Sequence, residues 1–252
     1  MKVFFVSIAA IVCAAVLAFG NIHYNDKINT TVGAAQGKTD SVNPGSSSNS
    51  SDITSLISNW PKDSQKLFQK RQKENKPFRL LMVGSDTHWT EPVVNSLKET
   101  YKGIVVEVQQ YELNSMEFIQ LGKYEELRQE KADLILLEPF TLKDNGEVRS
   151  EDSFANINTI MDRVTQDKKD TAFILQPPNP LYNATYYPMQ VAELKKFAKE
   201  KGITYMDHWT SWPDQKSEEM KGYLTSDGST PSDNGYEVWS RAVTDFLINK
   251  VK

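Results

Sequence analysis

The stretch FRLLMVGSD, residues 78–86, decides the fold class of this chain. Its first part, Phe78 to Val83, is an apolar run of strand length. Strands that are apolar on both faces are typical of a parallel sheet that helices cover on both sides. Four later runs have the same character, and they are Ile104 to Val108, Leu134 to Leu137, Ala172 to Leu175 and Ile203 to Met206. The sequence therefore predicts five strands.

Helical segments separate the predicted strands. They are expected near residues 92–102, 115–130, 152–167, 188–201 and 235–250. Pro188 suits a first helical turn, and Gly202 suits a C-terminal cap behind a lysine-rich helix end. Strands that alternate with helices of this length are typical of right-handed βαβ crossovers. The predicted fold class is therefore α/β, a three-layer sandwich with a five-stranded parallel sheet of the flavodoxin-like type. Residues 53–75 are expected to form one or two amphipathic helices outside that sheet.

Residues 1–24 are predicted to direct export of the chain. Lys2 precedes an uncharged apolar run from Val3 to about Gly20, which is at the lower limit for a helix that spans a bilayer. This length favours an uncleaved signal anchor over a signal peptide, although Val16-Leu17-Ala18 offers a cleavage site. The expected location is the cell membrane, with one span and an extracellular C-terminal domain. Cleavage would instead give a secreted protein.

The rest of the chain divides into a linker and one domain. Residues 25–52 are rich in Ser, Asn, Thr and Gly and contain almost no large apolar residue. Such a segment buries too little surface to offset its ordering entropy, so it is predicted to be a disordered linker. Residues 53–252 carry the alternating pattern and are predicted to form a single domain.

The composition excludes several classes of protein. A net charge of −4 argues against a nucleic-acid partner, which would select a clustered basic surface. The single cysteine, Cys13, excludes an internal disulfide framework and a thiolate zinc site. Because the chain has only 3 histidines, a metal centre would depend mainly on carboxylates. Neither a metal nor a cofactor is predicted.

Polar and aromatic residues gather in the loops that follow the predicted strands. In a doubly wound sheet, function collects at the carboxyl ends of the strands. These loops contain Ser85 and Asp86 after the first strand and His208 after the last. The aromatic residues in the same loops are Trp89, Phe140, Tyr182, Tyr186, Tyr187, Trp209 and Trp212. Some of them belong to the core, and a subset that includes Trp209 is expected to stack on sugar rings.

Three motifs together resemble the SGNH (GDSL-type) hydrolase superfamily over residues 77–252. The triplet Gly84-Ser85-Asp86 is similar to the Gly-Asp-Ser of that family with the last two residues exchanged. The run EPFTLKDNG, residues 138–146, stands near the family's Gly-x-Asn-Asp block. The run LTSDGSTPSDNG, residues 224–235, resembles the last loop, in which an Asp precedes the catalytic His by three positions. The chain looks like a subgroup of Gram-positive, membrane-anchored SGNH proteins often found with surface-polysaccharide genes.

The resemblance implies a serine nucleophile, a histidine base, an orienting aspartate and oxyanion donors. It assigns Ser85 as the nucleophile, Asp227 as the orienting acid and Asn145 as an oxyanion donor. Thr230 stands where the family has its histidine, and threonine cannot take a proton near neutral pH. His208 is the candidate replacement base, and its other interpretation is a structural histidine held between two tryptophans.

The nearby His88 is a second candidate for the missing base. It lies three residues after Ser85, so the turn between them would restrict its approach to the serine hydroxyl.

Two functions are consistent with these residues. The favoured one is an exported esterase that removes O-acetyl or other small acyl groups from a cell-surface polysaccharide. The alternative is a catalytically inactive SGNH-fold protein that binds glycan or assists exopolysaccharide assembly. A third possibility, a carboxylate-based hydrolase that uses Asp86, Glu138 and Asp144, needs no histidine. The expected partners are a polysaccharide or an acylated small substrate, and the membrane through the N-terminal helix.

Overall fold

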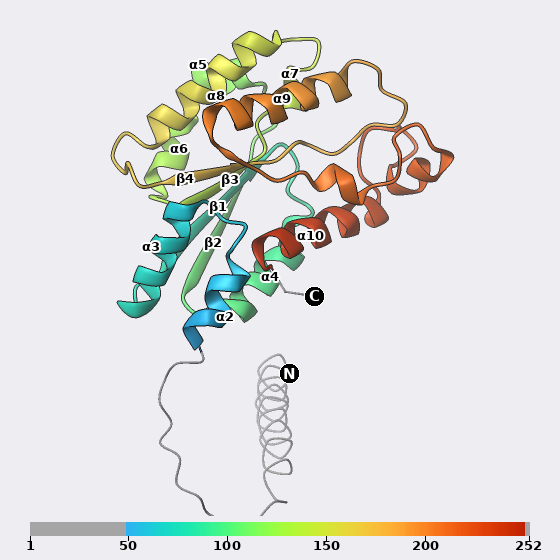
Figure 1. Cartoon of the computed structure of the whole chain (residues 1–252). Coiled ribbons are helices and arrows are strands. Elements are labelled where there is room, and N and C mark those ends of the chain that lie inside the picture. The colour runs from blue at the N-terminus through green and yellow to red at the C-terminus, as the bar shows by residue number, and fades with distance from the viewer. Residues whose placement is uncertain (1–48, 250–252) are drawn as a thin grey trace, which may run out of the picture. The chain divides into compact units, whose positions relative to one another are not determined.

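The computed structural model describes residues 49–249, which contain a five-stranded sheet with all neighbouring strands parallel (Figure 1). The strand order is β2-β1-β3-β4-β5. The strands are β1 (Phe78–Gly84), β2 (Ile104–Gln110), β3 (Leu134–Leu137), β4 (Ala172–Leu175) and β5 (Thr204–Tyr205). Each overlaps a predicted run, with β1 and β2 extending one and two residues further, so the α/β fold class with a five-stranded parallel sheet is confirmed.

Helices cover both faces of the sheet, as Figure 1 shows. One face packs against α2 (Asn49–Leu56), α3 (Lys62–Lys73), α4 (Thr90–Thr100) and α10 (Asp233–Leu247). The other face packs against α5 (Ser115–Gln120), α6 (Tyr124–Gln129), α8 (Ser150–Val164) and α9 (Tyr187–Lys201). Three short helices follow strands β3 and β5, and they are α7 (Thr141–Asp144), η1 (His208–Ser211) and η2 (Glu218–Tyr223).

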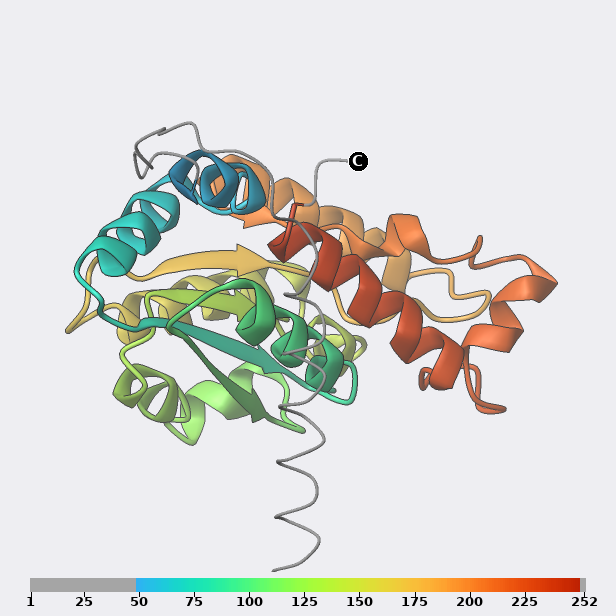
Figure 2. The ribbon, with the colours of Figure 1, turned by 90° about the horizontal axis from the view of Figure 1, so that it is seen from below.

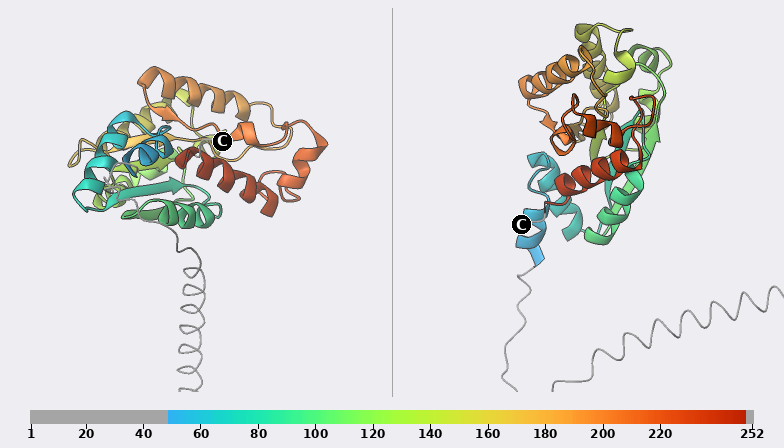
Figure 3. Two further views of the ribbon diagram at one scale, coloured as in Figure 1. Left: turned by 60° about the horizontal axis from the view of Figure 1, so that its bottom comes forward. Right: turned by 90° about the vertical axis from the view of Figure 1, so that its right-hand side faces the viewer.

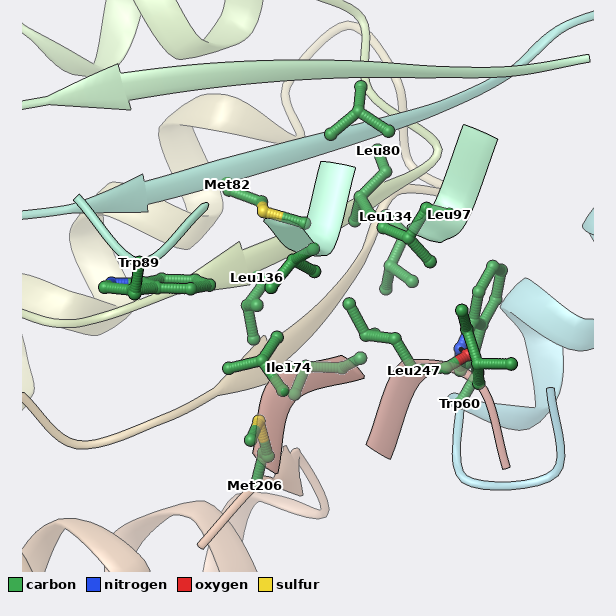
Figure 4. Close-up of a cluster of buried hydrophobic side chains, with 14 of the residues drawn as sticks. Trp60, Leu80, Met82, Trp89, Leu97, Leu134, Leu136, Ile174, Met206 and Leu247 are labelled. Atoms are coloured by element: carbon green, nitrogen blue, oxygen red, sulfur yellow. Dashed lines mark hydrogen bonds between the residues drawn. The ribbon is translucent and has the colours of Figure 1, made fainter. Parts of the chain in front are cut away.

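The alternation of side chains along β1 divides the core into two clusters. Leu80 and Met82 point into the cluster that contains α4 and α10, and Leu81 and Val83 point into the cluster that contains α5 and α8. Figure 4 shows the first cluster, with Trp60 filling the space beside Leu247. This burial on both faces is the reason why the strand sequences contain so few polar residues.

Two predicted segments are organised differently in the structure. The single helix expected over 115–130 is two helices, because Gly122 adopts a φ of 65° and the chain turns between them. Helix α2 begins at Asn49, inside the segment predicted to be a linker. The proposed signal anchor and most of that linker lie outside the described residues. Among the residues that the structure describes, no helix is long and apolar enough to cross a membrane.

The sheet order creates a crevice beside the carboxyl end of β1. Strand β1 pairs with β2 on one side and with β3 on the other. The chain leaves β1 toward α4 on one face of the sheet and leaves β3 toward α8 on the opposite face. Such a topological switch point is where doubly wound sheets bind ligands. The segment with η1 and η2 lies beyond the strand arrowheads in Figure 2 and projects to the right of the sheet in the left panel of Figure 3.

Candidate active site

The switch point brings together a serine and a buried glutamate. Ser85 follows β1 and Glu138 follows β3, and the Ser85 hydroxyl donates to Glu138 Oε1 over 2.6 Å. Glu138 is completely buried, and Ser85 retains 6% of its surface exposed. This distance between Ser85 Oγ and Glu138 Oε1 lies within the range in which a nucleophile transfers its proton to a base.

Burial is the main reason why the Glu138 carboxyl is an unusually weak acid. It raises the pKa of this carboxyl to about 8, because the charged form loses its hydration, and the negative charge of Asp86 adds to the effect. Hydrogen bonds from the Ser85 hydroxyl and from the backbone N–H groups of Ser85 and Asp86 oppose the shift. Glu138 Oε2 has no hydrogen-bond partner within residues 49–249. Because its pKa is about 8, the Glu138 carboxyl exchanges between its protonated and charged forms near neutral pH.

Stability is expected to reflect this titration. A raised folded-state pKa means that the unfolded chain loses the Glu138 proton first, so stability falls as pH rises toward 8. The slope is at most about 1.4 kcal/mol per pH unit. In Glu138→Gln the fall in melting temperature between pH 6.5 and 8.5 should be smaller than in the parent protein. Scanning calorimetry checks this, and equal slopes in the two proteins would contradict it.

Gly84 explains how the glutamate reaches this position. A Cβ atom at residue 84 would lie 2.5 Å from Glu138 Oε2. Only glycine therefore lets the Glu138 carboxyl pack against the end of β1, where its other oxygen meets the Ser85 hydroxyl.

Asp86 organises a second group of side chains next to Ser85. One carboxylate oxygen, Oδ1, lies 2.7 Å from His88 Nδ1 and also accepts from the His88 backbone N–H. The other oxygen accepts from the Tyr236 hydroxyl over 2.6 Å. Burial and the bond to Asp86 raise the pKa of Tyr236. The His88 side chain is 70% exposed, so its ring borders solvent beside the Ser85 loop.

Asp227 shapes its own loop. It accepts from the backbone N–H groups of Ser229 and Thr230 and from the hydroxyls of Thr225 and Thr230. The two backbone bonds are the largest causes that hold the pKa of Asp227 well below its usual range. The loop lies at the carboxyl edge, since Asn179 after β4 donates to the Ser229 carbonyl. Thr230 thus provides one of the two hydroxyl partners of Asp227, and within the described residues no hydrogen bond joins Asp227 to Ser85.

The structure does not bring His208 to Ser85. Its Nε2 lies 2.8 Å from the Pro177 carbonyl, and its Nδ1 accepts from Trp212 Nε1 over 3.0 Å. The ring is 1% exposed and stacks on Trp239 at 4.7 Å. Burial lowers the pKa of His208 to about 4. Because both nitrogens are engaged and the ring is neutral, this geometry is that of a structural histidine, and the expected role as a base is not supported.

Removing the His208 ring should therefore cost stability. In His208→Ala a cavity opens against Trp239, and the buried Trp212 N–H loses its acceptor. We expect a loss of about 3 kcal/mol in the free energy of unfolding. His88→Ala is the matched control, because that side chain is 70% exposed and its contact with Asp86 contributes about 1 kcal/mol or less. Urea denaturation measures both, and equal effects would contradict the structural role.

The other expected site residues lie apart from Ser85. Asn145 is exposed at the end of α7, and its side chain makes no hydrogen bond within the described part of the chain. Asp144 is buried and accepts from the Ser115 backbone N–H and the Ser153 hydroxyl, so it joins α5 to α8. These contacts do not support Asn145 as an oxyanion donor or Asp144 as a catalytic acid.

Trp209 lies in a separate groove. Its indole N–H donates to the Pro178 carbonyl over 2.6 Å, and its ring centroid is 5.5 Å from that of Tyr187. The groove has a volume of about 490 Å³ and is also lined by Asn183, Asp214 and Lys216. The aromatic residue is thus available at the surface, as a sugar-stacking role requires.

Two features of the site were not predicted. Glu138 was considered only as part of a carboxylate pair, and its contact with Ser85 depends on the pairing of β1 with β3. Tyr236 was missed because a tyrosine in the first turn of the last helix has no distinctive pattern. Within residues 49–249, no group of three or more His, Cys, Asp or Glu side chains is arranged to hold a metal ion.

Comparison with known proteins identifies the fold. No protein-family model matches the sequence, and no curated protein does. A carbohydrate esterase family 3 structure from Talaromyces cellulolyticus aligns with a TM-score of 0.56 and 10% identity, covering 68% of this chain and 96% of that one. An acetylxylan esterase from Geobacillus stearothermophilus aligns with a TM-score of 0.52 and 14% identity, covering 68% and 94%.

A third similar structure is a putative lipolytic protein of the G-D-S-L family from Desulfitobacterium hafniense. It has a TM-score of 0.52 and 18% identity, and the alignment covers 67% of this chain and 99% of that one. Likeness at such low identity concerns the fold and carries no residue roles. The chain therefore has the SGNH/GDSL hydrolase fold, as the motifs at residues 84–86 and 224–235 predicted.

Proposed function

We propose that this protein is an esterase that removes O-acetyl or other small acyl groups from a carbohydrate, with Ser85 as nucleophile and Glu138 as base. The observation that carries the proposal is the 2.6 Å hydrogen bond between these two side chains at the switch point of the sheet. A base whose pKa is about 8 is well matched to chemistry near neutral pH. The esterases with the same fold support the class of reaction.

In the proposed first step, Ser85 Oγ gives its proton to the Glu138 carboxylate and bonds to the acyl carbon. Collapse of the tetrahedral intermediate breaks the bond to the sugar oxygen, which takes the proton from Glu138. Water then gives a proton to Glu138 and bonds to the acyl carbon. When the acid leaves, Glu138 returns that proton to Ser85. One carboxyl thus replaces the absent histidine in both halves of the reaction.

The natural substrate is proposed to be a cell-surface polysaccharide. The apolar run that begins the chain and the linker after it support an exported, membrane-anchored protein, or a secreted one if the run is cleaved. The aromatic residues at the carboxyl edge support a carbohydrate rather than a lipid as the group that carries the ester.

The experiment that tests this function measures acetate release by the purified protein. The substrates are a chromogenic acetyl ester and acetylated xylan, assayed at pH 6 to 9. Release from acetylated xylan that exceeds the blank supports the esterase, and the chromogenic ester serves to compare the rates of variants. No release from acetylated xylan across this range would eliminate the proposed activity.

The Asp227 loop favours a second candidate function, glycan binding without hydrolysis. Thr230 occupies the place of the family histidine and satisfies Asp227 with its own hydroxyl. This arrangement favours a protein that retains the scaffold for glycan binding and lacks hydrolysis. Glycan binding by the parent protein without any product would support this second function.

A further inference from the structure

A groove begins at the Asp86 group and follows the seam between α4 and α10. Its volume is about 600 Å³. Its lining comes from His88, from Pro92 in α4 and from one face of α10 between Asp233 and Asp245. We call it the α4–α10 groove.

The groove is elongated because its lining follows one face of α10. The α10 residues in it recur at intervals of three and four positions, which is the spacing of side chains on one face of a helix. Asp233 and Asp245 stand at the two ends of this row, so it extends for about 18 Å at the rise of an α-helix. A site of this length suits an extended chain better than a single small molecule.

One end of the groove lies next to the proposed catalytic pair, Ser85 and Glu138. His88 and Tyr236 line it, their ring centroids lie 5.4 Å apart, and both side chains bond to Asp86. Asp86 directly follows Ser85 in the chain. A glycan that presents an ester to Ser85 therefore passes the two rings, whose flat faces suit contact with sugars.

The charge of the groove restricts what it accepts. Asp233, Glu237 and Asp245 provide three carboxylates, while Arg241 is the one lysine or arginine among the lining residues and pairs with Glu237. Because Arg241 offsets Glu237, an acidic polysaccharide would meet like charges mainly at Asp233 and Asp245, at the two ends of the row. A chain without acidic groups meets no such penalty.

We propose that the α4–α10 groove binds the glycan whose ester is hydrolysed at Ser85, and that it selects chains without acidic groups. The inference rests on the proposed function and extends it from the acyl group to the class of carbohydrate. In this proposal α10 binds the polysaccharide, and the loop after β1 carries the nucleophile Ser85.

Direct binding tests the groove independently of catalysis. Xylan oligosaccharides without acetyl groups are titrated into the full-length parent protein and into Thr244→Trp, whose indole would occupy the groove. We expect the dissociation constant to rise about tenfold or more in Thr244→Trp, equivalent to about 1.4 kcal/mol. Thr159→Trp, on α8 at the opposite face of the sheet, is the matched control and should bind as the parent does.

The charge selection has its own readout. Oligogalacturonates, which carry a carboxylate on each sugar, should bind the parent at least about tenfold more weakly than xylan oligosaccharides at low salt. The double variant Glu237→Gln/Asp245→Asn should narrow that difference. Circular dichroism confirms that each variant is folded.

These measurements separate failure of the groove from failure of the esterase. Unchanged xylan binding in folded Thr244→Trp, an equal loss in Thr159→Trp, or no xylan binding by the parent would each overturn the groove. Oligogalacturonate binding as tight as xylan binding would overturn the selection. Binding that behaves as expected without acetate release from acetylated xylan would reject the esterase and leave the groove as a glycan site.

Discussion

Ser85→Ala is expected to reduce acetate release by at least about a thousandfold, because the variant lacks the atom that attacks the acyl carbon. The hydroxyl is nearly buried and its partner is Glu138, so the substitution removes one oxygen without opening the surface. Initial rates on a chromogenic acetyl ester measure the effect. Ser96→Ala is the matched control, since that hydroxyl on α4 bonds only to the Pro92 carbonyl.

The pH profile should identify the base. If Glu138 accepts the proton, kcat/KM rises about tenfold per pH unit below its pKa of about 8 and levels off above it. Glu138→Gln should lower the rate by about a hundredfold to ten-thousandfold and remove this dependence. A rate unchanged by Ser85→Ala, or a profile that keeps its shape in Glu138→Gln, would contradict the proposed pair.

Gly235→Ala is expected to cause the largest loss of stability among single-methyl additions at the described glycines without a positive φ. The added Cβ would lie far inside van der Waals contact with the Tyr223 carbonyl oxygen and 3.0 Å from the Trp212 ring. Because the nearest obstacle is backbone, α10 must move away from the last residue of η2. We expect a loss of about 3 kcal/mol, or a melting temperature lower by about 6 to 12 °C.

Gly222→Ala is the control for that substitution. Its Cβ would meet no heavy atom within 4 Å, so its effect should stay within about 0.5 kcal/mol. Thermal unfolding of the two variants under one condition measures the contrast. Similar melting temperatures would mean that α10 is not held by this contact. A shift of α10 would also displace Tyr236 from Asp86, so Gly235→Ala should weaken activity in the remaining folded molecules.

The strands were predictable because their signal is local. The central strands β1, β3 and β4 are buried on both faces, so runs such as Leu134–Leu137 are apolar on both sides of the strand. The helix boundary at Gly122 was missed, since a single residue of positive φ divides a segment whose apolar pattern continues through it.

The site was only partly predictable. The pattern directs attention to Ser85 and to the carboxyl edge, but several residues of that edge were considered for catalysis. Both ring nitrogens of His208 are hydrogen-bonded, one to Pro177 and one to Trp212, and Asp227 accepts hydrogen bonds from its own loop. Such pairings depend on side-chain direction, which no sequence spacing reports.

The amino-acid sequence by itself determined the parallel α/β sheet and the edge where polar side chains collect. Both follow from local signals, namely the apolar runs and the alternation of strands and helices along the chain. Only the tertiary structure decided which carboxyl meets Ser85. Residues 85 and 138 are joined by the pairing of β1 with β3, and burial at that junction raises the pKa of the Glu138 carboxyl. Proton affinity of this kind is a property of the packed surroundings, and it exists only after the chain has folded.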